Sequence, residues 1–285
     1  MEDTAVDRKS LDISDITVVS VCYNSGEVIG EMVASIPEDV PVILVDNEAR
    51  TQFPDFGPRQ NVKIIPLAEN VGFGRGCNEG AKAAQTPYLL FLNPDSRLED
   101  GTLNALLNGA RHHPEASAFN PRLQNAKGDV AFKRRSYLLP RSEYIRRGWP
   151  DADFEVPVLS GSAIFVSKAN FDIVGGFDPE IFLYHEDDDL SLRLKKLGPL
   201  YFIRDAVVTH AGGHSSGRSA KVAYLKAYHM ARSRVYTGRK YDRPAPLFFA
   251  YLEAFRLMAS PITWFSARKR AKAAGFLAGA RSVSG

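Results

Sequence analysis

Four acidic residues stand side by side in the segment FLYHEDDDLSLRL, which runs from Phe182 to Leu194. Neighbouring like charges repel each other, so such a run calls for a reason. In a helix, the acids from Glu186 to Asp189 would occupy the first turn, where free N–H groups and the helix dipole favour negative charge. A carboxylate at a helix start that faces a ligand is also well placed as a general base. The run alone leaves both interpretations open.

The residues that follow the acids fit a helix with one apolar face. Leu190, Leu194 and Leu197 recur at helical spacing, and we expect them to point into the core. Asp189 and Arg193 are four residues apart, which predicts an ion pair on the helix. The acids therefore precede a segment that should be firmly packed.

A second acidic position follows a hydrophobic run in LNPDS, residues 92–96. Asn-Pro-Asp is strong turn chemistry, so Asp95 has a structural explanation. It could equally supply an oxygen ligand to Mg²⁺ or Mn²⁺, which would in turn bind a diphosphate. His210 ends a later apolar run, VVTHAGGHSSGR. The Gly-Gly that separates it from His214 disfavours a rigid helical zinc pair. A histidine at a strand end is more often structural, but the Ser/Gly/Arg loop beside His210 favours a metal or phosphate role.

The segment ENVGFGRGCNEG, residues 69–80, is rich in glycine. Its spacing, Gly72-x-Gly74-x-Gly76, is not that of a dinucleotide fingerprint, and it does not follow the first strand. A Rossmann dehydrogenase is therefore disfavoured. The small residues, together with Arg75 and Asn78, still suit close approach to a nucleotide.

These groups must be positioned by an α/β framework. Short β-branched or aliphatic runs predict strands within 15–24, 41–47, 61–67, 86–96, 159–167 and 200–210. Helical spacing predicts helices within 26–37, 72–85, 100–114, 184–198, 219–238 and 245–280, and residues 120–157 look basic and irregular. The alternation is typical of a mainly parallel sheet flanked by helices.

Polar residues collect where three predicted strands end: Tyr23 and Asn24, Asp46 with its neighbour, and Asn93 to Asp95. In open α/β sheets, ligands bind at the carboxyl ends of the strands. We therefore expect one site at this edge of the sheet.

Composition sets the outer limits. The 285 residues are 45% hydrophobic and 24% charged with a net charge of +3, which suits a globular protein and implies no nucleic-acid partner. Cys22 and Cys77 are too few for a disulfide scaffold or a zinc ribbon. The polar first residues do not read as a signal peptide, and Glu253, Arg256 and Pro261 make the apolar segment 246–265 a poor membrane span. These features predict a cytoplasmic protein.

Taken in order, the motifs resemble those of family 2 inverting glycosyltransferases of the GT-A fold, and most closely the bacterial rhamnosyltransferase-like subgroup. The matching stretches are VVSVCYNS, ILVDNEA, ENVGFGRGCNEG, LLFLNPDSRL, GGFDPEIFLYHEDDDLSLRLKKLG and VTHAGGHSSGR, which together span about residues 16–218. The resemblance implies transfer of one sugar from a nucleotide-diphosphate sugar, with dTDP-rhamnose as the first candidate, to a hydroxyl of a carbohydrate or lipid-linked glycan. The pathway implied is synthesis of a surface polysaccharide or glycolipid.

The resemblance also assigns roles to single residues. Those it places at the nucleotide are Tyr23, Asn24, Asp46, Asn70, Gly72, Arg75, Asn78 and Asn93. Among them, Asp46 would bond the pyrimidine base. Asp95 matches the last position of the D-x-D motif that binds Mg²⁺ or Mn²⁺, with Asn93 in the first position, and His210 would complete the metal shell.

Within the acid run, which matches the E-D-x-D stretch of the family, Asp187 would be the catalytic base. Glu186 would shape its surroundings, and Asp189 would be structural. The family's processive members carry Q-x-x-R-W, which is absent here, so the resemblance implies single-sugar transfer.

The same resemblance divides the chain. Residues 1–14 would be a flexible lead-in, and 15–218 a GT-A catalytic domain with a nucleotide-binding half, about 15–118, and an acceptor half, about 119–218. Residues 219–285 would form a C-terminal helical extension. Because its segment 245–280 combines aromatic and basic residues, three interpretations remain: peripheral contact with the inner face of the cytoplasmic membrane, packing on the catalytic domain, or a homodimer interface.

Three other functions compete with the transferase. A nucleotide-sugar-binding protein would bind a donor without turnover. A sugar nucleotidyltransferase needs basic residues in the loop after the first strand, where this chain has CYNSGEVIG. A metal hydrolase built on His210, His214 and the acid run would act without a sugar donor.

Overall fold

One mixed β-sheet organises the chain in the computed structural model, which describes residues 11–125, 127–146, 148, 150–210 and 219–284. Within these residues the sheet has ten strands, eight of them in the order β3-β2-β1-β4-β9-β6-β10-β5, while β7 pairs with β6 and β8 with β10. The strands are β1 (Ile16–Cys22), β2 (Val42–Asn47), β3 (Val62–Leu67), β4 (Tyr88–Leu92), β5 (Ser96–Leu98), β6 (Ala118–Gln124), β7 (Val130–Ala131), β8 (Phe154–Val156), β9 (Ala163–Ser167) and β10 (Leu200–His210).

The first half of the sheet is parallel. Strand β1 pairs in parallel with β2 and β4, and β2 pairs in parallel with β3. Strand β9 then runs antiparallel between β4 and β6, and β6 pairs in parallel with β10. The predicted α/β class with a mostly parallel sheet is confirmed.

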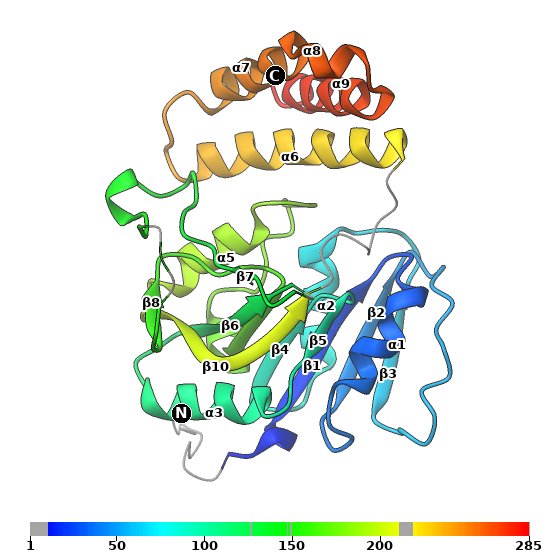
Figure 1. The fold of residues 1–285 in the computed structure, drawn as a ribbon, viewed down its shortest axis with the longest axis vertical. Coiled ribbons are helices and arrows are strands. Elements are labelled where there is room, and N and C mark those ends of the chain that lie inside the picture. Colours follow the sequence, from blue (N-terminus) through cyan, green and yellow to red (C-terminus); the bar gives the residue numbers. More distant parts are fainter. Residues whose placement is uncertain (1–10, 126, 147, 149, 211–218, 285) are drawn as a thin grey trace.

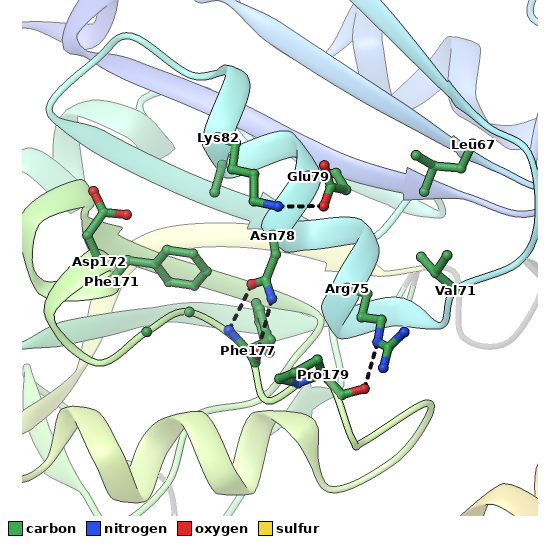
Figure 2. Close-up of a pocket in the computed structure, with 13 residues that line it drawn as sticks. Leu67, Val71, Arg75, Asn78, Glu79, Lys82, Phe171, Asp172, Phe177 and Pro179 are labelled. Atoms are coloured by element: carbon green, nitrogen blue, oxygen red, sulfur yellow. Dashed lines mark hydrogen bonds and ion pairs between the residues drawn. The ribbon is translucent and has the colours of Figure 1, made fainter.

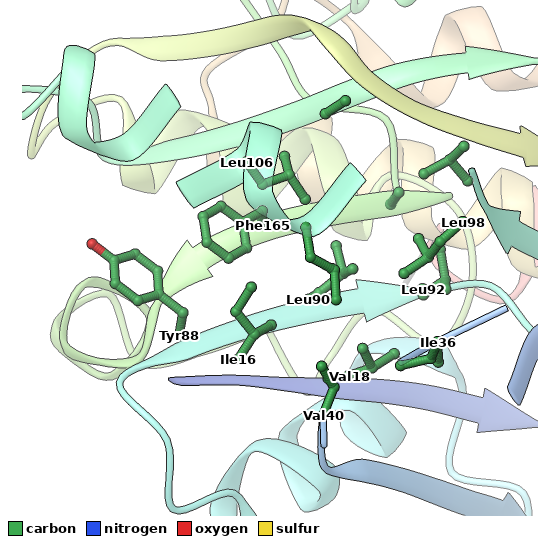
Figure 3. Packing of buried hydrophobic residues seen from close by; sticks show 14 of the residues in the cluster. Ile16, Val18, Ile36, Val40, Tyr88, Leu90, Leu92, Leu98, Leu106 and Phe165 are labelled. Atoms are coloured by element: carbon green, nitrogen blue, oxygen red, sulfur yellow. The ribbon is translucent and has the colours of Figure 1, made fainter. Parts of the chain in front are cut away.

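Every residue of β1, β2 and β4 is buried, as their continuous apolar sequences require for strands covered on both faces. On one face, α1 (Gly26–Ala34) and α3 (Thr102–His112) pack on a cluster that includes Ile16, Val18, Leu90, Leu106 and Phe165 (Figure 3). On the other face, α2 (Phe73–Ala83), α4 (Lys168–Ile173) and α5 (Glu186–Leu194) cover a second cluster. The sheet is therefore the middle layer of three.

The C-terminal extension is helical, as expected. It contains α6 (Ala220–Lys240), α7 (Pro246–Ala259), α8 (Pro261–Trp264) and α9 (Ala267–Arg281). Helix α6 lies between the sheet layers and the outermost helices α7 to α9 (Figure 1). A Cβ added to Gly275 or Gly279 would come within 2.2 Å of the carbonyl oxygens of Tyr224 or Tyr228, so α9 approaches α6 at backbone distance. The outer helices thus pack on α6, and α6 contacts the segment before α5, where the Ser233 hydroxyl donates to the Leu183 carbonyl at 2.8 Å.

Three expectations need correction. Residues 118–124 form the internal strand β6, although the region from 120 was expected to be irregular. Leu11 is buried and its carbonyl accepts a bond from Arg111, so residues 11–14 belong to the packed domain; residues 1–10 lie outside the described part. Leu197 is 43% exposed because α5 ends at Leu194, three residues earlier.

Candidate active site

The four acids occupy the first turn of α5, as predicted. His185, which precedes them, has a left-handed backbone with φ 70° and so turns the chain sharply into the helix. Successive helical residues point in different directions, so the four carboxylates meet four different environments. These environments separate their roles.

Asp187 is the acid that stays partly accessible, with its side chain 20% exposed. Its Oδ2 accepts from Lys133 Nζ at 2.6 Å and from the Gly161 backbone N–H at 2.9 Å. Its Oδ1 accepts from the Asp188 N–H at 2.9 Å. The carboxylate is therefore fixed in orientation and lies against a cation.

Asp188 is buried and paired. Its carboxylate lies 2.9 Å from Lys133 Nζ and 3.0 Å from His185 Nδ1. Burial alone would raise the pKa of Asp188, but the bond to His185 and the charge of Lys133 outweigh burial and lower that pKa. Asp188 thus helps to hold the lysine beside Asp187.

Glu186 is buried without a cation in contact, and its Oε2 has no hydrogen-bond partner among the described residues. Burial, followed by the negative charge of Asp187, raises the pKa of Glu186 to about 8. The raised pKa favours the protonated form of Glu186, which lessens the negative charge beside Asp187.

Asp189 is structural, as predicted. Its fully buried carboxylate accepts from Arg193 at 2.7 Å, as expected for the pair on α5. It also binds Lys240 at 2.6 Å and the hydroxyl of Tyr241 at 2.8 Å, from α6 and its C-terminal end. Removing one member of such a buried network leaves an uncompensated charge, which costs about 3–5 kcal/mol. The network joins α5 to the C-terminal extension.

The predicted metal residues also meet. Strand β5 pairs antiparallel with β10, and this register sets Ser96 opposite His210. Asp95 immediately precedes Ser96, so its Oδ1 lies 3.2 Å from His210 Nε2. Asn93 Nδ2 lies 3.4 Å from the same nitrogen. Strand pairing thus brings His210 to Asn93 and Asp95, which lie more than a hundred residues earlier in the sequence.

The loop before β9 links this group to Asp187. The Asn93 N–H donates to the Ser162 carbonyl at 3.0 Å, while Gly161 donates to Asp187. The amide of Asn120 on β6 accepts from the Ser160 N–H at 2.6 Å and donates to the Ser160 carbonyl at 3.1 Å. Residues 160–162 therefore hold the acid group of α5 and the strand-end group in one arrangement.

Asp95, His210 and Asn93 present one carboxylate, one imidazole and one amide, which are suitable donors for Mg²⁺ or Mn²⁺. The described residues contain no cluster of three or more His, Cys, Asp or Glu side chains arranged to hold a metal. His214 lies outside the described residues.

Of the residues predicted at the nucleotide, Asp46 is the last but one residue of β2 and is buried beside Cys22, the last residue of β1. Both of its carboxylate oxygens accept from the Thr51 N–H at 3.2 Å. Tyr23 and Asn24 follow β1 and are exposed. Three of the predicted nucleotide residues therefore lie at adjoining strand ends, as expected for parallel strands.

The other residues that were predicted to lie at the nucleotide contact other parts of the protein in this structure. Asn70 accepts from Asn47 and from the Gly72 N–H, both at 3.0 Å, which builds the turn before α2. Gly72 has φ +88°, and an added Cβ would lie 2.3 Å from the Phe182 carbonyl oxygen. This glycine is therefore required by the approach of the chain's own backbone.

Arg75 and Asn78 extend the same contact (Figure 2). Arg75 donates to the Pro179 carbonyl at 2.7 Å, and Asn78 exchanges two hydrogen bonds with the backbone of Phe177. Both residues line a hollow of about 670 Å³ between α2 and the segment 171–179. In this structure the glycine-rich motif holds the loop that leads into α5.

Two lysines at the site were missed from the sequence. Lys133 lies in the basic segment 132–149, where nothing marked it among the other cations. Lys226 on α6 lies close enough to Asp95 for that carboxylate to favour its charged form, although burial and Arg268 outweigh this and lower the pKa of Lys226. No local pattern could have indicated either position, because both depend on tertiary packing.

The fold and the site define a sugar-transferring enzyme of the GT-A type. Residues 17–171 match Glycosyl transferase family 2, and the chain belongs to this family. The protein is thus an inverting glycosyltransferase, a hexosyltransferase. It is 31% identical over 250 residues to the N-acetylglucosaminyl-diphospho-decaprenol L-rhamnosyltransferase of Mycobacterium tuberculosis. The aligned region covers 75% of this chain and 81% of the relative.

More distant proteins share the family or the fold. A poly-beta-1,6-N-acetyl-D-glucosamine synthase of Staphylococcus epidermidis is 27% identical over 40% of this chain and 30% of its own length. The fold is similar to that of S. aureus TarS 1–349 in complex with UDP, with TM-score 0.53 over 77% of this chain and 65% of that one. It is also similar to the fold of GalNAc-T7 with UDP, GalNAc and Mn²⁺, with TM-score 0.56 over 68% of this chain and 42% of that one. Sequence identities of 18% and 16% limit these two likenesses to the fold.

Among the described helices, none is both long enough and apolar enough to cross a membrane.

Proposed function

We propose that this glycosyltransferase moves one L-rhamnose from dTDP-rhamnose to a hydroxyl of a lipid-linked glycan, with Asp187 as the base. The observation that carries the proposal is the link through residues 160–162. It holds an accessible carboxylate and the Asn93, Asp95 and His210 group in one arrangement. The carboxylate of Asp187 can take a proton, while the Asn93, Asp95 and His210 group receives the diphosphate.

The chain's own residues account for the transfer. As the acceptor oxygen bonds to the anomeric carbon, the acceptor O–H bond breaks and its proton passes to Asp187. The bond from the anomeric carbon to the diphosphate breaks on the opposite face, so the configuration inverts. Asp46, Tyr23 and Asn24 would hold the nucleotide at the neighbouring strand ends.

A divalent cation, Mg²⁺ or Mn²⁺, would stabilise the negative charge on the leaving diphosphate when bound at this site. Asp95 and His210 would hold it, with Asn93 beside them, since Asp95 Oδ1 already lies 3.2 Å from His210 Nε2. Lys226 would add positive charge from α6 on the same side. Such electrostatic contributions are typically worth about 3–4 kcal/mol of barrier each.

The name of the mycobacterial relative supports the choice of donor sugar and acceptor. That mycobacterial enzyme transfers L-rhamnose to a sugar on a diphospho-decaprenol. The match runs over most of both chains, which supports the same donor and an acceptor of the same class. Transfer of a single sugar fits both that relative and the absence of Q-x-x-R-W.

A lipid-linked acceptor would bring the protein to the inner face of the cytoplasmic membrane, and the extension offers a surface for this contact. Large aromatic side chains are exposed on α7 and around α8: Phe248, Phe249, Phe255, Trp264 and Phe265. Exposed cations follow at the start of α9: Arg268, Lys269, Arg270 and Lys272. Aromatic groups beside clustered cations suit the interface of an anionic bilayer.

Sedimentation with vesicles tests this contact. Vesicles of phosphatidylglycerol should retain the protein and those of phosphatidylcholine should retain much less, and Trp264→Ala with Phe265→Ala should abolish the difference. If the same variant instead turns a dimer into a monomer without changing vesicle binding, the aromatic surface is a subunit interface and the membrane contact is rejected.

A donor screen tests the transferase. The wild type and Asp187→Asn are incubated with Mg²⁺ or Mn²⁺ and each of dTDP-rhamnose, UDP-glucose, UDP-galactose, UDP-N-acetylglucosamine and GDP-mannose. Thermal shift reports binding, and release of nucleotide diphosphate reports turnover. We expect dTDP-rhamnose to stabilise both proteins and only the wild type to release nucleotide.

The other outcomes separate the alternatives. Binding of a donor without turnover, even with octyl N-acetylglucosaminide as acceptor, would indicate a binding protein. Turnover by Asp187→Asn equal to that of the wild type would remove Asp187 as the base. If another nucleotide sugar is the one consumed, the family assignment stands and the rhamnose proposal falls.

A further inference from the structure

Lys133 makes the shortest contact of the predicted base. Its Nζ lies 2.6 Å from Asp187 Oδ2 and 2.9 Å from Asp188 Oδ1, so one ammonium bridges two carboxylates. The lysine side chain is 24% exposed and that of Asp188 is 7% exposed. A pair this sheltered is much less screened by water than a surface ion pair.

The backbone holds Lys133 in place from both sides. Phe132 packs edge to face on Phe202 of β10, with 5.3 Å between ring centres. The carbonyl of Arg134 accepts from the Ile145 N–H at 3.0 Å. Strand β7, two residues before Lys133, is paired with β6. The lysine therefore projects from a fixed strand end, and its contact with Asp187 is built into the fold.

The hydrogen bonds to Asp187 leave one direction open. A carboxylate offers about four acceptor sites, two on each oxygen. Lys133 and the Gly161 N–H use the two sites on Oδ2, and the Asp188 N–H uses one on Oδ1. Among the bonds that the described residues make, the acceptor site left over is on Oδ1, and the side chain is still one-fifth exposed.

We infer that Lys133 is a positioning residue for the transfer: with Gly161 it occupies Oδ2 of Asp187 and leaves Oδ1 to receive the proton of the acceptor hydroxyl. This role rests on the proposed function of Asp187 as base. Lys133 also places a positive charge 2.6 Å from the carboxylate that would take up the proton.

The charges around Lys133 fit this role. Asp187 and Asp188 face it directly, Glu186 lies within electrostatic range, and His185 contacts Asp188 from the other side. Burial alone would lower the pKa of Lys133, but its two carboxylate partners outweigh burial and raise it. The lysine therefore stays charged over the whole range in which the enzyme would work.

Gly161 is the second positioning element. A Cβ at this residue would lie 3.2 Å from Asp187 Cβ and 3.3 Å from Oδ2, closer than ordinary contact. Alanine at 161 would thus push the carboxylate away from the N–H that holds it. Glycine is needed here for proximity to the base, since no unusual backbone angle is involved.

The test compares Lys133→Met with Lys195→Met. Lys195 is the matched control because it forms a similar 2.6 Å pair with Glu143, away from the acids of α5. Release of nucleotide from the donor found in the screen is followed between pH 5 and pH 9, with octyl N-acetylglucosaminide as acceptor. We expect Lys133→Met to lose tenfold or more in kcat, with donor KM changed less than twofold, and its acidic limb to move to higher pH. Lys133→Arg should recover part of kcat.

The same variants provide a readout that does not need turnover. The carboxylate carbon signal that disappears in Asp187→Asn is titrated by NMR in the wild type, Lys133→Met and Lys195→Met. We expect its midpoint to move to higher pH in Lys133→Met alone. If the signal and the pH profile match those of the wild type, or if Lys195→Met gives the same changes, the positioning role is rejected.

The two proposals fail in different ways. If the wild type consumes no donor, the proposed function has failed, while the titration still decides whether Lys133 governs Asp187. If the wild type is active and Lys133→Met retains its kcat and pH profile, the proposed function stands and the inference about Lys133 falls.

Discussion

Replacing Glu186 by Gln should stabilise the protein at pH 8, and the gain should shrink toward pH 5. Glu186 is buried, and its pKa is raised from 4.5 to about 8. Between these two values the folded state holds a proton that the unfolded chain releases. Stability therefore falls as the pH rises through this window and changes no further above about pH 8. Gln has nearly the same shape and carries no charge, so it removes this dependence.

The magnitude follows from the width of the window. Each pH unit within it contributes at most about 1.4 kcal/mol, so the difference between the two proteins should grow by up to about 4 kcal/mol from pH 5 to pH 8. For a chain of this size, 1 kcal/mol shifts Tm by roughly 2 °C, so the difference in Tm should grow by roughly 5–10 °C.

The assay is thermal unfolding of the wild type, Glu186→Gln and Glu143→Gln at pH 5, 6, 7, 8 and 9. Glu143 is the control because it is a partly exposed glutamate paired with a lysine. Glu143→Gln should run parallel to the wild type. A constant offset between Glu186→Gln and the wild type at every pH would refute the reasoning, because it would mean that Glu186 is ionised throughout.

Three further outcomes are expected. Asp189→Ala should lower the free energy of unfolding by about 3–5 kcal/mol in urea, because Arg193 and Lys240 lose the fully buried carboxylate that they share; a loss under 1 kcal/mol would contradict this. Gly72→Ala should lower Tm clearly more than Gly101→Ala, since both glycines have positive φ but only the first would meet a carbonyl oxygen, at 2.3 Å. Cys22 and Cys77 should not react with a thiol reagent at pH 8 until the protein is unfolded, because burial raises the pKa of both thiols.

The sequence predicted the sheet well because its central strands are continuous apolar runs that end in polar residues. Covered parallel strands leave this pattern directly in the sequence. Strand β6 was missed because it contains Asn120, Pro121 and Arg122, which look like loop residues. Its pairing with β9 and β10 overrides that local preference.

The site was predictable where the chemistry is local. The pair of Asp189 with Arg193 follows from helical spacing, and it is present at 2.7 Å. The proximity of Asp95 to His210 was expected from the family resemblance, and its physical cause is the pairing of β5 with β10. The place of Lys133 could not be predicted, because its partner is 54 residues away and many nearby cations look the same.

The glycine-rich motif shows a different limit. Its small residues were expected to make room for a nucleotide, whereas Gly72 makes room for the Phe182 carbonyl and Asn78 binds the backbone of Phe177. A glycine reports that something approaches closely, but the sequence does not say whether that is a ligand or the protein itself.

The bonds between α5 and α6 also bear on how the chain could be recombined. Asp189 on α5 forms an ion pair with Lys240 and accepts a hydrogen bond from the hydroxyl of Tyr241. The Ser233 hydroxyl donates to the Leu183 carbonyl, just before α5, at 2.8 Å. A chimera joined near residue 219 would inherit the acid from one parent and its counter-charges from the other. Exchange of specificity between relatives should therefore succeed only when these residues are transferred together, and an alignment of relatives should show positions 189 and 240 changing as a pair.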